Sequence, residues 1–139
     1  MTDAPPRASL WLQIPYWLAT GIVVLLLVWA SVMYVALPDV AAGFFAQFGY
    51  PAYLIYPLAA LKFLALLVII LHRWNDLRDM AYAAYFLNMA MALTAHIVHG
   101  DVFAHALVGM IAVPVSYLLG NRVRGRPRHN FFARFAGAA

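Results

Sequence analysis

The stretch PAYLIYPLAALKFLALLVIIL, residues 51–71, contains a single charged residue, Lys62, near its centre. About 20 predominantly apolar residues are enough for a helix to cross the hydrocarbon core of a bilayer. The stretch therefore predicts a transmembrane helix. A charge at the bilayer centre costs about 2.5 kcal/mol or more, and residues that carry one almost always face the interior of a helix bundle. Lys62 is thus the first candidate for a functional site.

The composition of the whole chain indicates an integral membrane protein. Of the 139 residues, 66% are hydrophobic and 10% are charged, whereas about 25% are charged in a soluble domain. Four stretches are long enough to span a bilayer, and they are 15–37, 52–71, 80–99 and 102–120. The connections between them are short, so we predict an all-α fold, an antiparallel four-helix transmembrane bundle. The first stretch exceeds the apolar core of a secretion signal, and we expect it to be retained.

We expect the chain to divide into a cytoplasmic N-terminal lead-in at 1–12, a single four-helix membrane domain at 13–121 and a basic cytoplasmic tail at 122–139. The connection between the first two spans, 38–51, is rich in phenylalanine. Such a segment is typical of a short helix that lies in the membrane interface. We predict one interfacial helix there.

Three polar or small residues are placed to begin or end helices. Asp39 can cap the interfacial helix, and Gly49 can end it. Asp101 can cap the last span in the same way as Asp39. Asp79 is expected in the first turn of the third span, where the helix dipole favours a carboxylate.

The basic residues outside the spans fall on one side of the predicted membrane. They are Arg7, Arg73, Arg78, Arg122, Arg124, Arg126, Arg128 and Arg134. The connections after the first and third spans contain no Lys or Arg. By the positive-inside rule both termini are cytoplasmic, and we expect a bacterial inner membrane. Arginines beside a membrane are typical of contact with anionic lipid headgroups, so the net charge of +4 predicts the lipid bilayer as a partner and no nucleic acid.

The aromatic residues at the start of the first span predict a belt at the inner interface. These residues are Trp11, Tyr16 and Trp17, and such rings sit at the level of the headgroups. Further along the same span, Thr20, Ser31 and Tyr34 share one face, which we expect to turn inward.

Lys62 is too deep for its side chain to reach water. It lies about 11 residues, or roughly 15 Å, from either end of its span, beyond the reach of ordinary snorkelling. None of the predicted spans contains Asp or Glu. Asn88 of the third span lies at a similar depth, and its amide oxygen is a suitable acceptor for an ammonium group. We predict that Lys62 and Asn88 approach one another, either as a ligand or proton site or as a structural clamp.

A polar face runs along the third span, where Tyr85, Asn88, His96 and His99 share one sector of the helix. Polar groups in hydrocarbon are expected to point into the bundle. On the facing spans, two more side chains lie near the depth of His96. The predicted ligand-binding residues are Lys62, Asn88, His96, Tyr56, Tyr85 and His105.

The histidines raise the question of a metal or a haem. His96, His99 and His105, with Asp101 nearby, are residue types that can ligate zinc, iron or copper, and His96 with His105 can clasp a haem between helices. The spacing is permissive, however, and polar side chains commonly hydrogen-bond across helices in membranes. We expect neither a metal nor a haem. The chain contains no cysteine, which excludes thiol redox chemistry and thiolate ligands.

Several residues occur in an order that resembles the DoxX-like family of small four-helix integral membrane proteins. They are Gly49-Tyr50-Pro51, Lys62, Asp79-Met80-Ala81-Tyr82-Ala83, Asn88, Ala92, Ala95-His96 and Gly100-Asp101. The family usually has glutamate at the position of Asp79 and glycine at that of Ala84. The resemblance implies that Lys62, Asn88 and His96 are the matching polar positions within the membrane, with no catalytic role attached to them.

The resemblance also implies two kinds of function. The family name comes from a subunit linked to thiosulfate oxidation and quinone reduction, which suggests an accessory subunit of a membrane redox system. In this hypothesis Lys62 and Asn88 bind a carbonyl of a quinone or another lipophile, and Tyr56, His96 and His105 exchange protons. Any enzymatic activity would belong to a membrane oxidoreductase complex, with electrons from a redox protein partner or a bound cofactor.

The alternative is a non-enzymatic assembly factor or accessory subunit for other membrane proteins. More distant relatives resemble assembly chaperones, and Lys62 and the histidines would then fix helix packing. Gly109 and Ala112 on the last span allow close helix approach, which suits folding or partner docking. A homo-oligomer fits either hypothesis. A carrier is a weaker hypothesis, because alternating access generally uses inverted repeats.

Overall fold

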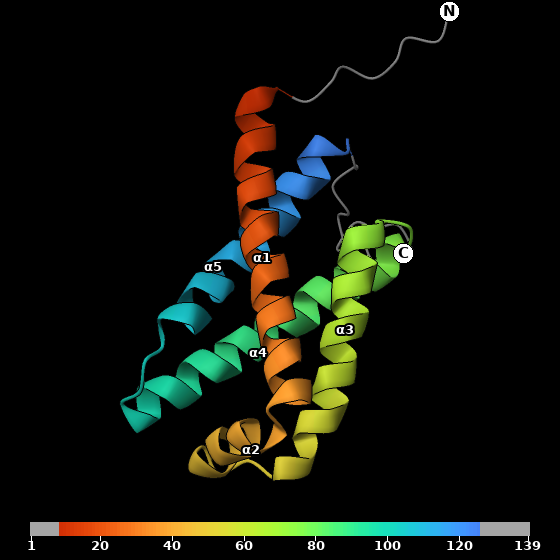
Figure 1. The fold of residues 1–139 in the computed structure, drawn as a ribbon. Helices are drawn as coiled ribbons and strands as arrows, with labels where there is room; N and C mark the ends of the chain where they lie inside the picture. The colour runs from red at the N-terminus through yellow and green to blue at the C-terminus, as the bar shows by residue number, and fades with distance from the viewer. Residues whose placement is uncertain (1–8, 126–139) are drawn as a thin grey trace, which may run out of the picture.

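The computed structural model describes residues 9–125 and contains only helices and their connections over that range. In chain order the helices are α1 (Leu10–Ala36), α2 (Pro38–Gln47), the 3-10 turn η1 (Ala52–Leu54), α3 (Ile55–Leu71), α4 (Asn75–His99) and α5 (Ala104–Val123). Four segments are long and apolar enough to cross a membrane: α1, η1 with α3, α4 and α5. The predicted antiparallel four-helix bundle with a short helix between its first two spans is confirmed (Figure 1). The lead-in through residue 8 and the tail from residue 126 lie outside the described residues.

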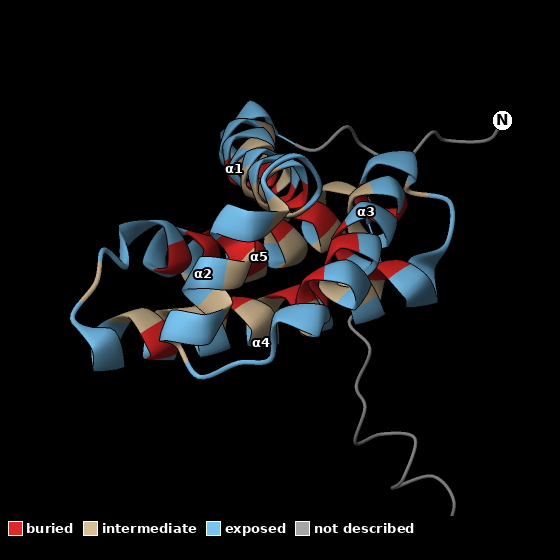
Figure 2. Ribbon diagram, turned by 60° about the horizontal axis from the view of Figure 1, so that its bottom comes forward, coloured by how far each residue is buried: buried red, intermediate tan, exposed pale blue. Residues whose placement is uncertain are grey.

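The four long helices do not run side by side in one direction. In Figure 1, α1 and α3 lie along a similar direction, while α4 and α5 cross them obliquely. The short helix α2 lies at the end of the bundle where α1 ends and α3 begins. Figure 2 shows buried residues on the faces where helices meet and exposed residues around the outside. Large apolar side chains such as Leu25, Trp29 and Leu64 are on the exposed surface, where hydrocarbon can contact them.

Small residues allow α1, α4 and α5 to pack closely. A Cβ atom at Gly109 of α5 would lie 2.5 Å from the sulfur of Met89 on α4 and 3.2 Å from a methyl carbon of Leu26 on α1. Real Cβ atoms essentially never approach other atoms so closely. Gly109 therefore marks the point where the three helices meet, as small residues do in membrane bundles.

A buried chain of hydroxyl groups joins the same three helices. The Ser116 hydroxyl of α5 lies 2.7 Å from that of Thr20 on α1 and 2.9 Å from that of Tyr82 on α4. Thr20 and Ser31 are both buried, which confirms the predicted inward face of α1. Each of these three hydroxyl groups has a hydrogen-bond partner inside the protein, as a polar group in hydrocarbon requires.

One end of the bundle is closed by a second polar network that the sequence did not indicate. Tyr16, expected in the aromatic belt, is only 2% exposed. The Nδ1 of His72 lies 2.7 Å from the carbonyl oxygen of Ile70, so Nδ1 donates and Nε2 accepts a hydrogen bond from the Tyr16 hydroxyl at 3.1 Å. The guanidinium group of Arg124 donates to the Tyr16 oxygen at 2.8 Å. Tyr16 thereby ties the start of α1 to the ends of α3 and α5, while Trp17 stays exposed.

Helix boundaries account for two further corrections and one confirmed prediction. Because α2 begins with Pro38 at its first position, Asp39 lies in the first turn and makes no capping hydrogen bond. Because α5 begins only at Ala104, Asp101 accepts a hydrogen bond from the Val102 amide instead of capping the helix. The prediction for Gly49 is confirmed, since it follows α2 with a φ of +74°.

The start of α4 lies earlier than predicted. The helix begins at Asn75, so Asp76 and not Asp79 occupies its first turn. Arg78, expected in a connection outside the span, is therefore on the helix and is buried.

We predict that Gly109→Leu destabilises the bundle, whereas Gly21→Leu does not. Overpacking a tight contact costs about 1–3 kcal/mol, and nothing lies within 4 Å of a Cβ placed at Gly21. Thermal unfolding of the detergent-purified variants measures the difference. Equal melting temperatures for the two variants would contradict the close packing at Gly109.

We predict that Ser116→Ala lowers the unfolding free energy by about 1 kcal/mol. The substitution removes the hydrogen bonds of Ser116 to Thr20 and Tyr82, and an interhelical hydrogen bond in a membrane contributes on the order of 1 kcal/mol or less. Ser31→Ala is the matched control, because Ser31 is equally buried and its hydroxyl has no hydrogen-bond partner among residues 9–125. Unfolding in mixed micelles measures both changes. A loss for Ser31→Ala as large as that for Ser116→Ala would show that the hydroxyl chain contributes nothing.

Candidate functional site

The buried face of α3 places Lys62 inside the bundle. The buried residues of this helix include Ile55, Ala59, Lys62 and Ile69, which follow one another at steps of four, three and seven residues. Such steps return to one side of a helix. Lys62 is 5% exposed, so its aliphatic part packs among apolar neighbours and its ammonium group is removed from the surrounding medium.

The ammonium group of Lys62 meets three uncharged side chains. Its Nζ donates to the amide oxygen Oδ1 of Asn88 on α4 at 2.7 Å, which confirms the predicted approach of the two residues. Nζ also lies 5.4 Å from the ring centre of Tyr34 on α1 and 5.7 Å from that of Tyr85 on α4. A cation this close to a ring is attracted by its negative face. Three helices thus converge on one positive charge.

An apolar groove leads away from Lys62 between α3 and α4. The cavity has a volume of about 230 Å³. An apolar engineered cavity of about 150 Å³ in another protein binds benzene, so this one has room for a single ring. Its lining residues are Leu27 of α1, Leu58, Leu61, Lys62, Leu64, Ala65 and Val68 of α3, and Leu77, Met80, Ala81, Ala84, Tyr85 and Asn88 of α4. Leu61, Leu64 and Met80 are also exposed on the outer surface. The groove therefore opens sideways, toward the lipid.

Tyr85 supplies a second polar group to this groove. It is only 4% exposed, and its hydroxyl has no hydrogen-bond partner among the described residues. A buried, unsatisfied hydroxyl costs about 1–3 kcal/mol. Lys62, Asn88 and Tyr85 are the polar residues among the lining side chains, so the groove combines an apolar wall with one polar end.

Tyr56, predicted from the sequence as a ligand-binding residue, lies outside the groove. Tyr56 is 70% exposed and is not among the residues that line the groove. Six residues separate it from Lys62, which turns it about 240° around the helix at 100° per residue. Tyr34 was missed as a site residue, although its predicted inward face was the signal that could have identified it.

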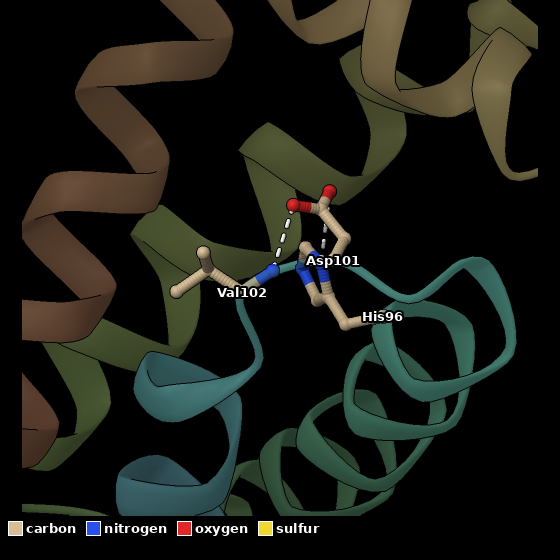
Figure 3. A network of polar contacts seen from close by, with 3 residues as sticks. All are labelled: His96, Asp101 and Val102. Atoms are coloured by element: carbon tan, nitrogen blue, oxygen red, sulfur yellow. Dashed lines mark hydrogen bonds and ion pairs between the residues drawn. The ribbon is translucent and has the colours of Figure 1, made fainter.

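His96 and His105 lie together, but in a different place from the groove. The ring centres of His96 and His105 are 4.7 Å apart, and the ring of Phe48 at the end of α2 lies 4.9 Å from that of His96. The Nδ1 of His96 is 3.5 Å from a carboxylate oxygen of Asp101 (Figure 3). His99 is exposed and its ring packs at 5.2 Å from that of Phe48. This cluster joins α2, α4 and α5 at the end of the bundle opposite the Tyr16 network.

The histidine cluster does not have the geometry of a metal centre. Within residues 9–125 no group of three or more His, Cys, Asp or Glu side chains is placed to hold a metal ion. The rings of His96 and His105 meet edge to face, with an angle of 84° between their planes. Packing of aromatic edges on faces is favourable in itself, so the cluster can be explained by helix packing.

The fold and the site define a four-helix membrane protein with a lateral, lipid-facing groove that ends at a buried lysine. The sequence model of the DoxX-like family matches residues 18–119, which includes the greater part of all four spans and the whole groove. The chain belongs to the DoxX-like family. Neither the curated proteins nor the solved structures gave a match to it.

We predict that Asn88→Leu destabilises the protein by about 1–3 kcal/mol, because it leaves the buried ammonium group without its hydrogen-bond acceptor. The double variant Lys62→Met with Asn88→Leu is expected to lose less than the sum of the single variants, since it removes both partners. Unfolding free energies in mixed micelles give the coupling.

Thr94→Val is the control for this cycle. Its hydroxyl donates to the carbonyl of Ala90 within α4, so it should add independently to Lys62→Met. Strict additivity of the Lys62 and Asn88 substitutions would contradict a direct interaction between them.

Proposed function

We propose that this DoxX-like protein binds a quinone or another lipophilic molecule in the groove between α3 and α4, as an accessory subunit of a membrane redox system. The observation that carries the proposal is the groove itself, which joins a lipid-facing apolar wall to the buried polar group of Lys62, Asn88 and Tyr85. Ligand sites typically combine apolar walls with a few placed polar groups. A lipophile can enter such a site sideways from the bilayer.

The arrangement supports a ligand with an oxygen at its head. The Lys62 ammonium group has three N–H donors, of which Asn88 accepts one, and the Tyr85 hydroxyl has its donor free among the described residues. A carbonyl oxygen with two lone pairs can accept from both side chains. The ring and tail of the ligand would then lie along Leu58, Leu61 and Leu64.

The histidines receive no role in ligand binding in this proposal. His96 and His105 are outside the lining of the groove, and their contacts with Phe48 and Asp101 account for their placement. Electrons would come from a redox partner, since the chain has no cysteine to carry them.

We further propose that both termini lie in the cytoplasm and that the protein resides in a bacterial inner membrane. The Tyr16 network brings the start of α1 together with the ends of α3 and α5. Arg73, Arg122 and Arg124 lie at these same ends, and Arg78 lies near the start of α4, which follows α3 directly. Clustering of arginine on one side supports the positive-inside assignment.

Extraction of the purified protein, followed by chromatography for quinones and other lipids, tests the proposal directly. A lipophile at near-equal molar amount in the wild type, and a much smaller amount in Lys62→Met, would support it. Crosslinking in native membranes addresses the rival function. A stoichiometric protein partner with no bound small molecule would favour an assembly factor instead.

We predict that Ala84→Phe reduces the bound lipophile about tenfold or more, because the new ring fills the groove and removes the volume that the ligand needs. A loss of 1.4 kcal/mol in binding corresponds to a factor of ten. Ala83→Phe is the matched control, since Ala83 is exposed on the same helix and does not line the groove. Equal retention of lipophile by both variants would place the ligand elsewhere.

A further inference from the structure

We propose that the groove selects a lipophile whose head carries a negative charge on oxygen: the carboxylate of a single-chain fatty acid or the phenolate of a reduced quinone. The inference rests on the proposed function and adds the charge of the ligand to it. It comes from the chemistry around Lys62, which leaves one positive charge and two hydrogen-bonding functions for a ligand to complete.

The first observation is that the part of the chain that the structure describes supplies no counter-charge at this depth. Within residues 9–125 the polar and ring contacts of Lys62 are with Asn88, Tyr34 and Tyr85, all of them uncharged. The described carboxylates, Asp39, Asp76, Asp79 and Asp101, lie within the first five residues of a helix or in a connection. An unpaired buried charge costs several kcal/mol, and pairing with an opposite charge offsets much of that cost. A ligand anion would supply the missing partner.

The second observation is that two lining residues of the groove, Lys62 and Tyr85, retain hydrogen-bond donors that no described residue accepts. Lys62 and Tyr85 both line it, and the Tyr85 hydroxyl is buried without a partner among the described residues. Two oxygens of a carboxylate, or one phenolate oxygen, can accept from both side chains. The Lys62 ammonium group makes a charge-assisted hydrogen bond to any acceptor, but only an anionic oxygen also supplies the opposite charge and makes the bond from the neutral Tyr85 hydroxyl charge-assisted. Such bonds are roughly twice as strong as neutral ones, so the anionic head gains more here than an alcohol or an ester would.

The third observation concerns the rest of the wall. Apart from Lys62, Asn88 and Tyr85, every lining residue is apolar, and the single charged group among them is the lysine. The lining residues include no carboxylate to repel an anion. The small volume, about 230 Å³, suits one ring or a segment of one chain and not a two-chain phospholipid.

Photolabelling of the full-length protein in phosphatidylcholine nanodiscs tests the inference. Two probes are compared, a palmitate analogue that carries a diazirine on its chain and the matched hexadecanol analogue. At equal concentrations we expect about tenfold more labelling of α3 and α4 peptides by the acid, a difference of about 1.4 kcal/mol, because the carboxylate pairs with the charge of Lys62 and the hexadecanol hydroxyl does not. Protection by unlabelled palmitate, by a short-chain ubiquinol or by its oxidised quinone distinguishes the sources.

Two variants separate charge from packing. Lys62→Gln keeps hydrogen-bonding capacity and removes the charge, so labelling by the acid should fall to the level of the alcohol. Asn88→Asp leaves Lys62 in place and adds a carboxylate at its hydrogen-bonding partner, so the preference for the acid should be lost there as well. This second variant keeps the test valid if Lys62→Gln does not fold.

The outcomes distinguish this inference from the proposed function. Equal groove labelling by acid and alcohol, with equal protection by ubiquinol and ubiquinone, would overturn the charge preference and leave lipophile binding intact. A preference for the acid that persists in Asn88→Asp would also overturn it. Absence of groove labelling by either probe and of a quinone in the purified protein would overturn both proposals. Stronger protection by ubiquinol than by ubiquinone would assign the anion to a reduced quinone.

Discussion

The requirement that a charge inside a membrane be satisfied by the protein fixes the arrangement of this bundle. Lys62 lies at mid-depth of α3 and reaches its acceptor only if that face of the helix turns toward α4 and α1. The hydrogen bond from Nζ to Asn88, at 2.7 Å, and the rings of Tyr34 and Tyr85 meet this requirement. Once α3 is rotated in this way, Ile55, Ala59 and Ile69 are also buried, and Tyr56 is directed outward.

The bundle is closed on one side and open on another, and the difference follows from side-chain size and hydrogen bonding. At the junction of α1, α4 and α5, Gly109 allows close contact, and the hydroxyls of Thr20, Ser116 and Tyr82 bond to one another. Between α3 and α4, the small side chains of Ala81 and Ala84 face leucines that reach the outer surface. That space is not filled by the protein, and the result is the groove beside Lys62.

At the two ends of the bundle, in contrast to the groove, the polar residues join helices to one another. Tyr16, His72 and Arg124 connect three helix ends, and His96 with His105 and Phe48 connects the opposite ends. These contacts explain the polar residues at both ends by packing and hydrogen bonding alone. Two groups that line the groove still lack a partner among residues 9–125: the Lys62 ammonium group has no counter-charge, and the Tyr85 hydroxyl has no hydrogen bond. Together they direct the functional proposal to α3 and α4 of a DoxX-like protein.

The sequence by itself determined the number of spans, their boundaries within a few residues, and the shared depth of Lys62 and Asn88. These properties depend on hydrophobicity and on the constant rise per residue of a helix, which are local. Rotation about the helix axis is not local, because it depends on the side chains of every neighbouring helix. Tertiary packing alone therefore explains why Tyr16 is buried, why Tyr56 faces outward, and why the cavity lies along α3 and α4, away from His96 and His105.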